Sequence, residues 1–217
     1  RDCSSLVSVK ISYGVESIGM RGFSTCRSLV SVTIPVASVA TPATLCQGVT
    51  TIGNGNLFMA TSHVAHDCVV EDDCVFANSV LLAGHCHVQS NCTISGSSAV
   101  AQFSTLGRCS FIGGLVGVRK DAEPFLRHDR RPDSISATPF SVNTVGLVRG
   151  GFSDEAVAAL KKAYTLLFRK ERGAPLAARC ALLEEQGLMT EEVRELAEFM
   201  RRKATSSSGR YLDTRQD

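Results

Sequence analysis

Apolar residues recur at every sixth position along the middle of the chain. The run is unbroken over ten large side chains: Val64, Val70, Phe76, Leu82, Val88, Ile94, Val100, Leu106, Ile112 and Val118. Two positions before each of them lies a smaller residue, and four of these are Cys68, Cys74, Cys86 and Cys92. Residues two apart in a strand point to the same face. Each hexad therefore predicts a short strand with one wide and one narrow side chain inward, and the four cysteines are expected in the core.

The positions between these pairs carry Gly, Asn, Asp, His and Ser, which allow turns or face water. A six-residue period is typical of the left-handed parallel β-helix, in which three hexads, or eighteen residues, complete one triangular coil. We therefore expect residues 62–119 to form about three coils. We place the β-helix domain at residues 46–122.

A different repeat opens the chain. The segment Cys3–Ile11 recurs 23 residues later as Cys26–Ile34, so that Val9 aligns with Val32. This period and its details resemble leucine-rich repeats of the bacterial surface-protein subclass. We expect a partial leucine-rich repeat at residues 1–35 and a linker at 36–45. The alternative is two incidental short strands.

Beyond Arg119 the hexads stop, and the prolines that follow predict a connecting loop over residues 123–152. Ser153 is the expected N-cap of an amphipathic helix, and residues 176–183 and 190–200 predict two more helices. The sequence thus predicts a mainly β protein with a helical C-terminal domain at 153–204. We expect a disordered tail at 205–217.

Composition adds few constraints. The chain has 217 residues, 44% of them hydrophobic, and a formal net charge of +2, which gives no general reason to expect nucleic acid or membrane lipid as a partner. We expect the basic segment 127–131 to be a solvated loop. No apolar run approaches the roughly 18 residues of a transmembrane helix, so we expect a soluble, cytoplasmic protein. The nine cysteines should be reduced, and the start at Arg1 in mid-pattern suggests a fragment or processed piece.

The candidate chemistry lies on the coils. His85 follows His66 by one coil plus one residue, so the two should be neighbours on adjacent coils. His66, Gly84 and Gln102 are spaced by one coil each and should form a vertical file. A glycine beside a histidine lets a ligand approach the backbone, where an N–H can bind an oxyanion. Asp67, which follows His66, can fix the imidazole tautomer and suit it to act as a general base.

Two other interpretations of these histidines stay open. His63 and His66 could be turn residues on a solvated face. Together with His85 they could also suggest zinc. Against a metal, the nearby cysteines point inward and no carboxylate has an evidently suitable spacing and orientation. We expect neither a metal nor an organic cofactor.

Several motifs together resemble the acyl carrier protein–UDP-N-acetylglucosamine O-acyltransferases that begin lipid A synthesis. The likeness runs from about Cys46 to Arg172, and it rests on Asn56–Met59, His63–Cys68, Leu82–His85, Ala99–Phe103, Ala137–Asn143 and Gly146–Ser153. Two positions depart from the family pattern. Ala101 stands where a histidine is usual, and Val145 stands where an acidic residue is common.

The resemblance implies a reaction and a set of roles. A 3-hydroxyacyl chain would pass from acyl carrier protein to the 3-hydroxyl of UDP-N-acetylglucosamine, with His66 as base, Asp67 positioning it and Gly84 donating to the oxyanion. It further implies a homotrimer with clefts between neighbouring subunits. Residues implied to bind substrate are His63, His85, Gln102, Gly114 at the position that gauges acyl length, and Asn143 and Arg149 at the nucleotide.

Two other functions stay open. The leucine-rich start, which stands where the family has further coils, favours a non-catalytic repeat scaffold, and we expect weak or no activity from a chain without those coils. A hexapeptide acyltransferase with another acceptor is the second alternative.

Overall fold

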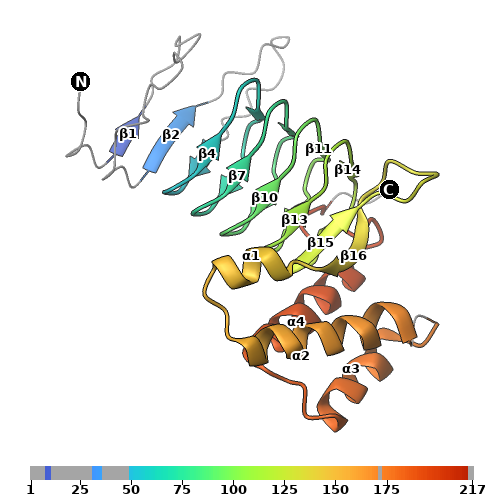
Figure 1. Cartoon of the computed structure of the whole chain (residues 1–217). Helices are drawn as coiled ribbons and strands as arrows, with labels where there is room; N and C mark the ends of the chain where they lie inside the picture. The colour runs from blue at the N-terminus through green and yellow to red at the C-terminus, as the bar shows by residue number, and fades with distance from the viewer. Residues whose placement is uncertain (1–7, 11–30, 36–48, 171–172, 215–217) are drawn as a thin grey trace.

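The computed structural model describes residues 8–10, 31–35, 49–170 and 173–214. Short strands stack into a parallel β-solenoid, and the helices gather at its C-terminal end (Figure 1). The strands are β1 (Ser8–Lys10), β2 (Ser31–Pro35), β3 (Val49–Ile52), β4 (Leu57–Phe58), β5 (His63–Val64), β6 (Val69–Val70), β7 (Val75–Phe76), β8 (Leu81–Leu82), β9 (His87–Val88), β10 (Thr93–Ile94), β11 (Ala99–Val100), β12 (Thr105–Leu106), β13 (Phe111–Ile112), β14 (Gly117–Val118), β15 (Leu126–Asp129) and β16 (Thr138–Val142). The helices are α1 (Thr144–Arg149), α2 (Asp154–Thr165), the π-helical turn η1 (Leu166–Lys170), α3 (Leu176–Glu185) and α4 (Glu191–Thr205).

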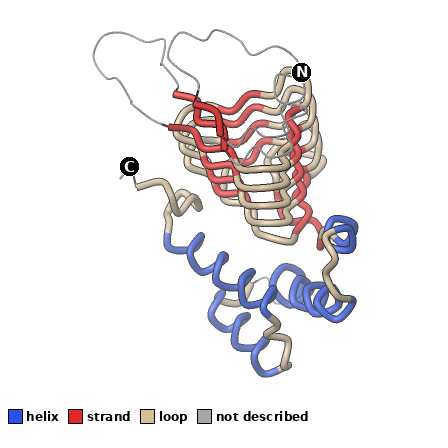
Figure 2. The backbone as a smooth tube through the Cα atoms, turned by 90° about the vertical axis from the view of Figure 1, so that its left-hand side faces the viewer, coloured by secondary structure: helices blue, strands red, loops and turns tan. Residues whose placement is uncertain are grey.

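Three parallel sheets form the sides of the solenoid, which is seen in Figure 2 as a stack of coils. We name them after their first strands: the β3 sheet (β3-β6-β9-β12), the β4 sheet (β4-β7-β10-β13) and the β5 sheet (β5-β8-β11-β14). In the β3 sheet Val69 pairs with Thr51 on one side and His87 on the other, a step of eighteen residues each way. The predicted coil length and the three coils predicted for residues 62–119 are confirmed, and one further coil begins before them at residue 49.

The inward residues form the core as predicted. Phe76, Leu82, Val88 and Ile94 are 0% exposed, whereas Val64 in the first coil is only half-buried. The four core cysteines are free thiols with 0–1% exposure. The small inward position is narrow, and the thiols fill it while donating to carbonyl oxygens of the next coil: Cys68 Sγ to Ala83 O, Cys74 Sγ to Gln89 O, Cys86 Sγ to Ala101 O and Cys92 Sγ to Gly107 O.

The corners between sheets depend on a repeated left-handed residue. One residue per hexad, immediately before the small inward position, has a φ near +60°: Thr61, Asp67, Asp73, Ser79, His85, Asn91, Ser97, Phe103, Cys109 and Leu115. Asn and Asp tolerate this conformation best, and a bulky side chain there is a strained exception. Phe103 is such an exception, and it lies one coil above His85 and two above Asp67.

The N-terminal repeat is described only at two strands. β1 and β2 pair in parallel with Val9 opposite Val32, which is the register that the 23-residue repeat predicts. β2 then pairs antiparallel with β3 at the start of the solenoid. The leucine-rich assignment of residues 1–35 stays a prediction, and the proposed linker at 36–45 lies outside the described residues.

Residues 123–152 are more ordered than the predicted loop. β15 adds to the end of the β4 sheet beside β13, and β16 returns antiparallel to it. The basic segment is likewise not a solvated loop at its start, because Arg127 lies in β15 and its guanidinium contacts Asp129 at 2.7 Å. The loop was predicted from the prolines of this segment, but Pro139 lies in a strand with an irregular register rather than in a turn.

The helical region begins where the sequence predicts. Ser153 caps α2 by accepting a hydrogen bond from the Ala156 amide, and Thr190 caps α4 in the same way through the Val193 amide. The apolar faces of α2, α3 and α4 pack together with Phe125 and Leu126 from the end of the solenoid. No helix within the described residues has the length and apolar content to cross a bilayer.

The expected disordered tail is instead ordered as far as residue 214. The carboxylate of the buried Asp121 accepts hydrogen bonds from the amides of Thr105 and Tyr211, at 2.7 and 2.9 Å. The Arg210 guanidinium donates to the Arg119 carbonyl oxygen. The contacts of Asp121 with Tyr211 and of Arg119 with Arg210 join positions about ninety residues apart, which composition at the end of a chain does not reveal.

A buried ion network joins the solenoid to α4. The Glu123 carboxylate is 2.9 Å from His128 Nε2 and 2.8 Å from Lys203 Nζ, with the side chains of Glu123 and His128 only 5% and 2% exposed. Burial by itself would raise the pKa of Glu123. The Lys203 ammonium and the His128 hydrogen bond outweigh that effect and lower the pKa from its ordinary 4.5 to about 2.

We predict an acid-sensitive component of stability from this network. Because the folded-state pKa of Glu123 is depressed, its contribution is fully present above about pH 4.5 and is lost as the pH falls through about 2. The loss should amount to about 3 kcal/mol in the free energy of unfolding. Urea unfolding across this range should show it in the parent and in the exposed-site control Glu198→Gln, but not in Glu123→Gln. An unchanged pH slope in Glu123→Gln would contradict the assignment.

Candidate active site

A short polar contact on the coils joins two adjacent residues, His66 and Asp67. His66 Nδ1 lies 2.7 Å from Asp67 Oδ2, and their side chains are 31% and 21% exposed. Asp67 has a φ of +57°, and this left-handed turn brings its carboxylate to the imidazole of the preceding residue. In neutral His66 the Nδ1 proton is donated to Asp67, which leaves Nε2 as the acceptor.

His85 comes to the same carboxylate from the next coil. Its Nε2 is 3.6 Å from Asp67 Oδ2, and its ring meets the His66 ring edge to face, with centroids 5.0 Å apart. Phe103 stacks on the other side of His85 at 4.7 Å and 11°. We call these residues, together with Gly84 and Gln102, the histidine corner, since all lie where the chain passes from the β5 sheet to the β3 sheet. The predicted neighbourhood of His66 and His85 is confirmed.

The His66 ring packs directly against the backbone of Gly84. A Cβ added at Gly84 would lie 2.6 Å from His66 Cε1 and 2.7 Å from Nε2. Any side chain at this position would therefore displace the imidazole. The Gly84 backbone thus lies beside the nitrogen that is free to act as a base, which is the arrangement that the vertical file predicts.

The other predicted substrate residues are spread more widely. Gln102 is exposed above Gly84, and His63 is exposed on the outer face of the β5 sheet. Gly114 lies at a different corner, between the β4 and β5 sheets. It is open there, because the nearest atom to an added Cβ would be Gly96 O at 3.5 Å. The structure therefore does not bring His63 or Gly114 into contact with His66.

Asn143, the N-cap of α1, and Arg149, the last residue of α1, lie away from the histidine corner. Asn143 caps α1 by accepting from the Gly146 amide at 3.2 Å, and its Nδ2 donates to Cys109 O at 2.9 Å. Cys109 is at the corner between the β3 and β4 sheets. Arg149 is exposed in the last turn of α1.

An open cleft of about 630 Å³ lies between α1 and the β4 sheet. Its sides include Asn143, Val145 and Arg149, and its floor includes Phe111 and Arg127. The Arg127 guanidinium is 5.8 Å from the Phe111 ring centroid, so a cation and an aromatic face are exposed together. This cleft and the histidine corner are separated by the width of the β3 sheet, so one chain does not unite the two groups of predicted residues.

Sequence reasoning did not single out the cleft floor or Phe103. Val75, Thr93 and Phe111 are spaced by eighteen and lie in one outward file of the β4 sheet. The same arithmetic places Phe103 one coil above His85. The eighteen-residue period thus indicates that these residues are neighbours. It does not indicate that the rings of His85 and Phe103 are stacked.

His66, Asp67 and His85 also form a group suited to a metal. One ligand atom from each lies within 4.8 Å of the others, the one such group in the described part of the chain. The sequence argument that no carboxylate has a suitable spacing is therefore wrong. It overlooked Asp67, whose left-handed conformation points the side chain at both rings.

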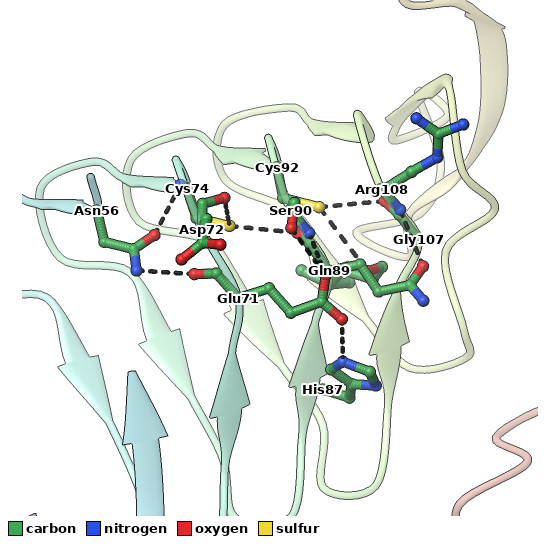
Figure 3. A network of polar contacts seen from close by, with 11 residues as sticks. Asn56, Glu71, Asp72, Cys74, His87, Gln89, Ser90, Cys92, Gly107 and Arg108 are labelled. Atoms are coloured by element: carbon green, nitrogen blue, oxygen red, sulfur yellow. Dashed lines mark hydrogen bonds and ion pairs between the residues drawn. The ribbon is translucent and has the colours of Figure 1, made fainter. Parts of the chain in front are cut away.

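A second histidine–carboxylate pair provides an internal comparison. His87 Nε2 lies 2.7 Å from Glu71 Oε1, and the other oxygen of Glu71 accepts from Ser90 N and Oγ (Figure 3). Burial would raise the pKa of Glu71, but the hydrogen bonds from Ser90 and His87 outweigh it and lower the pKa. The His87 pair has the same contact distance as the His66 pair. The residue one coil beyond His87 is Thr105, however, where Gly84 lies one coil beyond His66.

Two family models match the chain. The second domain of the UDP-N-acetylglucosamine O-acyltransferases matches residues 123–210, and the hexapeptide repeat of bacterial transferases matches residues 49–84. Acyl carrier protein–UDP-N-acetylglucosamine O-acyltransferases from Anaeromyxobacter sp. and Thiobacillus denitrificans are 38% and 41% identical over 154 and 156 residues, or 71% and 72% of this chain. The chain belongs to the UDP-N-acetylglucosamine O-acyltransferase family. It spans only about half the length of such relatives, since each of these alignments covers 58% of the relative.

Solved acyltransferase structures share the fold. The UDP-N-acetylglucosamine acyltransferase of Arabidopsis superposes with a TM-score of 0.65 at 33% identity, covering 72% of this chain and 54% of that one. The enzyme of Francisella novicida gives a TM-score of 0.61 at 30% identity, covering 68% and 52%. The predicted left-handed β-helix with a helical C-terminal region is confirmed by this likeness.

The contact between Gly84 and His66 predicts a strongly non-additive pair of variants. Gly84→Ala should lower the free energy of unfolding by about 1–3 kcal/mol, because the added methyl group collides with the imidazole. In a His66→Ala background most of this loss should disappear, which a double-mutant cycle in urea would measure. Gly117→Ala is the control, because its nearest neighbour would be 3.8 Å away. Additive losses at Gly84 and His66 would refute the contact.

Proposed function

We propose that the chain transfers a 3-hydroxyacyl group from acyl carrier protein to the 3-hydroxyl of UDP-N-acetylglucosamine, the first step of lipid A biosynthesis. The observation that carries this proposal is the His66–Asp67 pair at 2.7 Å over the bare backbone of Gly84. Family membership adds the reaction class, because the relatives that align with the chain are named for this acyl transfer.

His66 is the general base of the proposed reaction. Its Nε2 takes the proton of the sugar 3-hydroxyl while the oxygen attacks the thioester carbonyl. Asp67 holds the Nδ1 proton, so that Nε2 stays available and the imidazolium that forms is stabilised. The tetrahedral oxyanion accepts a hydrogen bond from the Gly84 N–H. Collapse breaks the C–S bond, and the imidazolium returns its proton to the thiolate of the carrier protein.

The remaining predicted residues bind substrate in this proposal. His85 and Gln102 extend the histidine corner along the coils, and His63 flanks it on the β5 sheet. Gly114 is open at its corner, so an acyl chain that lies along the β5 sheet would reach it unhindered. Arg149, exposed on α1, suits a diphosphate because a guanidinium donates paired hydrogen bonds to phosphate oxygens.

A homotrimer would unite the two halves of this site. The histidine corner and the α1 cleft of one chain lie on either side of the β3 sheet. If neighbouring copies pack corner to corner, the histidine corner of one faces the α1 cleft of the next. We propose that Asn143 and Arg149 act on a substrate whose acceptor hydroxyl meets His66 of the adjacent subunit.

The scaffold alternative is less well supported. A scaffold needs no imidazole paired with a carboxylate over a glycine, and the chain keeps all three. Ala101 and Val145 are apolar at positions where the family usually has polar side chains, and Val145 lines the α1 cleft. We therefore expect activity below that of the family. The soluble substrates fit the predicted cytoplasmic location.

Substitution of the proposed base should separate an enzyme from a scaffold. His66→Ala should lower kcat by about 10²–10⁴-fold, because general base catalysis is lost. His87→Ala, which removes the other histidine with a carboxylate at 2.7 Å, should leave kcat within a fewfold of the parent. The assay is acyl transfer from 3-hydroxyacyl carrier protein to UDP-N-acetylglucosamine. Equal losses in the two variants would count against His66 as the base.

Arg149→Ala should act on binding rather than on chemistry. We predict an increase in KM for the sugar nucleotide of about 10–100-fold, with kcat little changed, because a charged hydrogen bond contributes about 1.5–3 kcal/mol. Arg131→Ala is the matched control, since it removes an exposed arginine outside the cleft. If Arg131→Ala raised KM as much as Arg149→Ala, general positive charge would explain the effect instead.

A further inference from the structure

The histidine corner holds three metal-type ligands around one small volume. His66 Nδ1 and His85 Nε2 lie 2.7 and 3.6 Å from the same oxygen, Asp67 Oδ2. Ligand atoms bound tetrahedrally to one Zn²⁺ at about 2.0–2.1 Å are about 3.3–3.4 Å apart. One ligand atom from each of the three residues already lies within 4.8 Å of the others, so rotation of the side chains would bring all three to one ion.

The neighbouring side chains already hold the ligands in place. Phe103 stacks on His85 at 4.7 Å and 11°, which fixes the plane of that ring. The His66 ring rests on Gly84, and the left-handed turn at Asp67 aims its carboxylate. Supporting contacts of this kind orient metal ligands and lessen the cost of organising them. Each ligand is 21–39% exposed, so an ion from solvent can reach them.

We propose that the histidine corner binds a divalent transition-metal cation of the Zn²⁺ class, and that the bound ion inhibits acyl transfer. The ion takes the place of the proton between His66 Nδ1 and Asp67 Oδ2 and gains His85 Nε2 as a third ligand, and the proton moves to His66 Nε2, because a neutral imidazole keeps one N–H. Two imidazoles and one carboxylate are ligands that Zn²⁺ accepts, and three protein ligands leave a position for water.

Inhibition follows from the same atoms and rests on the proposed function. An imidazole whose Nδ1 binds a cation carries its proton at Nε2, so that nitrogen cannot accept the proton of the sugar hydroxyl, and Asp67 no longer stabilises an imidazolium. The reaction therefore loses its base while the metal is bound. Metal binding itself does not depend on the acyl-transfer proposal.

The first test is calorimetric titration of the reduced, metal-free chain with Zn²⁺ alone. We expect one site, weakened by at least about 100-fold in His85→Gln and in Asp67→Asn, since loss of even a supporting partner costs roughly 10–100-fold. His87→Gln is the matched control, because its histidine also contacts a carboxylate but lacks a third ligand in the described structure. Circular dichroism would establish that each variant is folded.

Co²⁺ substitution identifies the ligands independently. Visible d–d bands without a thiolate-to-cobalt charge-transfer band would assign nitrogen and oxygen ligands and exclude the buried cysteines. Equal Zn²⁺ binding by the parent, His85→Gln and Asp67→Asn, or no binding by the parent, would overturn the proposal.

Acyl-transfer assays with Zn²⁺ then separate the proposed metal site from the proposed acyl-transfer function. Zn²⁺ should inhibit acyl transfer over the concentration range in which it binds, and a chelator should restore the rate. Binding at the corner without inhibition would overturn the inhibitory role. If the parent has no acyl transfer, the proposed function fails while the calorimetric and cobalt results still decide the metal site.

Discussion

Hydrogen bonds between successive coils are the constraint on which the structure depends. Amides of one coil donate to carbonyl oxygens of the next at a fixed offset, as from Val69 N to Cys86 O and from His87 N to Ser104 O, at 2.9 and 3.1 Å. These bonds form only if each coil has the same number of residues, because one insertion would turn inward side chains outward. The strict period therefore determines the core and the corners together.

The same constraint produces the histidine corner. Each corner needs one residue at positive φ, and the chain places Asp67, His85 and Phe103 there on three successive coils. Histidine is fairly common in a left-handed turn, but the bulky ring of Phe103 is a costly choice there. In return Phe103 stacks on His85, whose ring meets that of His66. One strained residue of the corners thus borders the candidate chemistry, and Leu115 is another at a different corner.

Sequence alone predicted the parts that repeat. Val70 to Val118 was assigned to the core because its period is local, and the nearness of His66 and His85 followed from one coil length. The misjudged segments depend on contacts distant in sequence: Asp121 with Tyr211 orders the tail, and Arg108 with Glu195 at 2.7 Å joins the solenoid to α4. The Asp67 carboxylate points at the two histidine rings because of its backbone dihedral angles, which composition does not show. Its direction completes the group of three candidate metal ligands.

We infer that one chain carries two halves of a site, with the base at the histidine corner and the nucleotide contacts on α1. Complementation between two variants would test this arrangement. His66→Ala and Arg149→Glu would be unfolded together, refolded as a mixture and assayed for acyl transfer at a sugar-nucleotide concentration far below the KM of Arg149→Glu, where each variant alone is nearly inactive. We expect the mixture to regain activity, because some assemblies pair an intact corner with an intact α1 of a neighbour. A mixture that stays as inactive as its parts, although the two chains co-assemble, would contradict it.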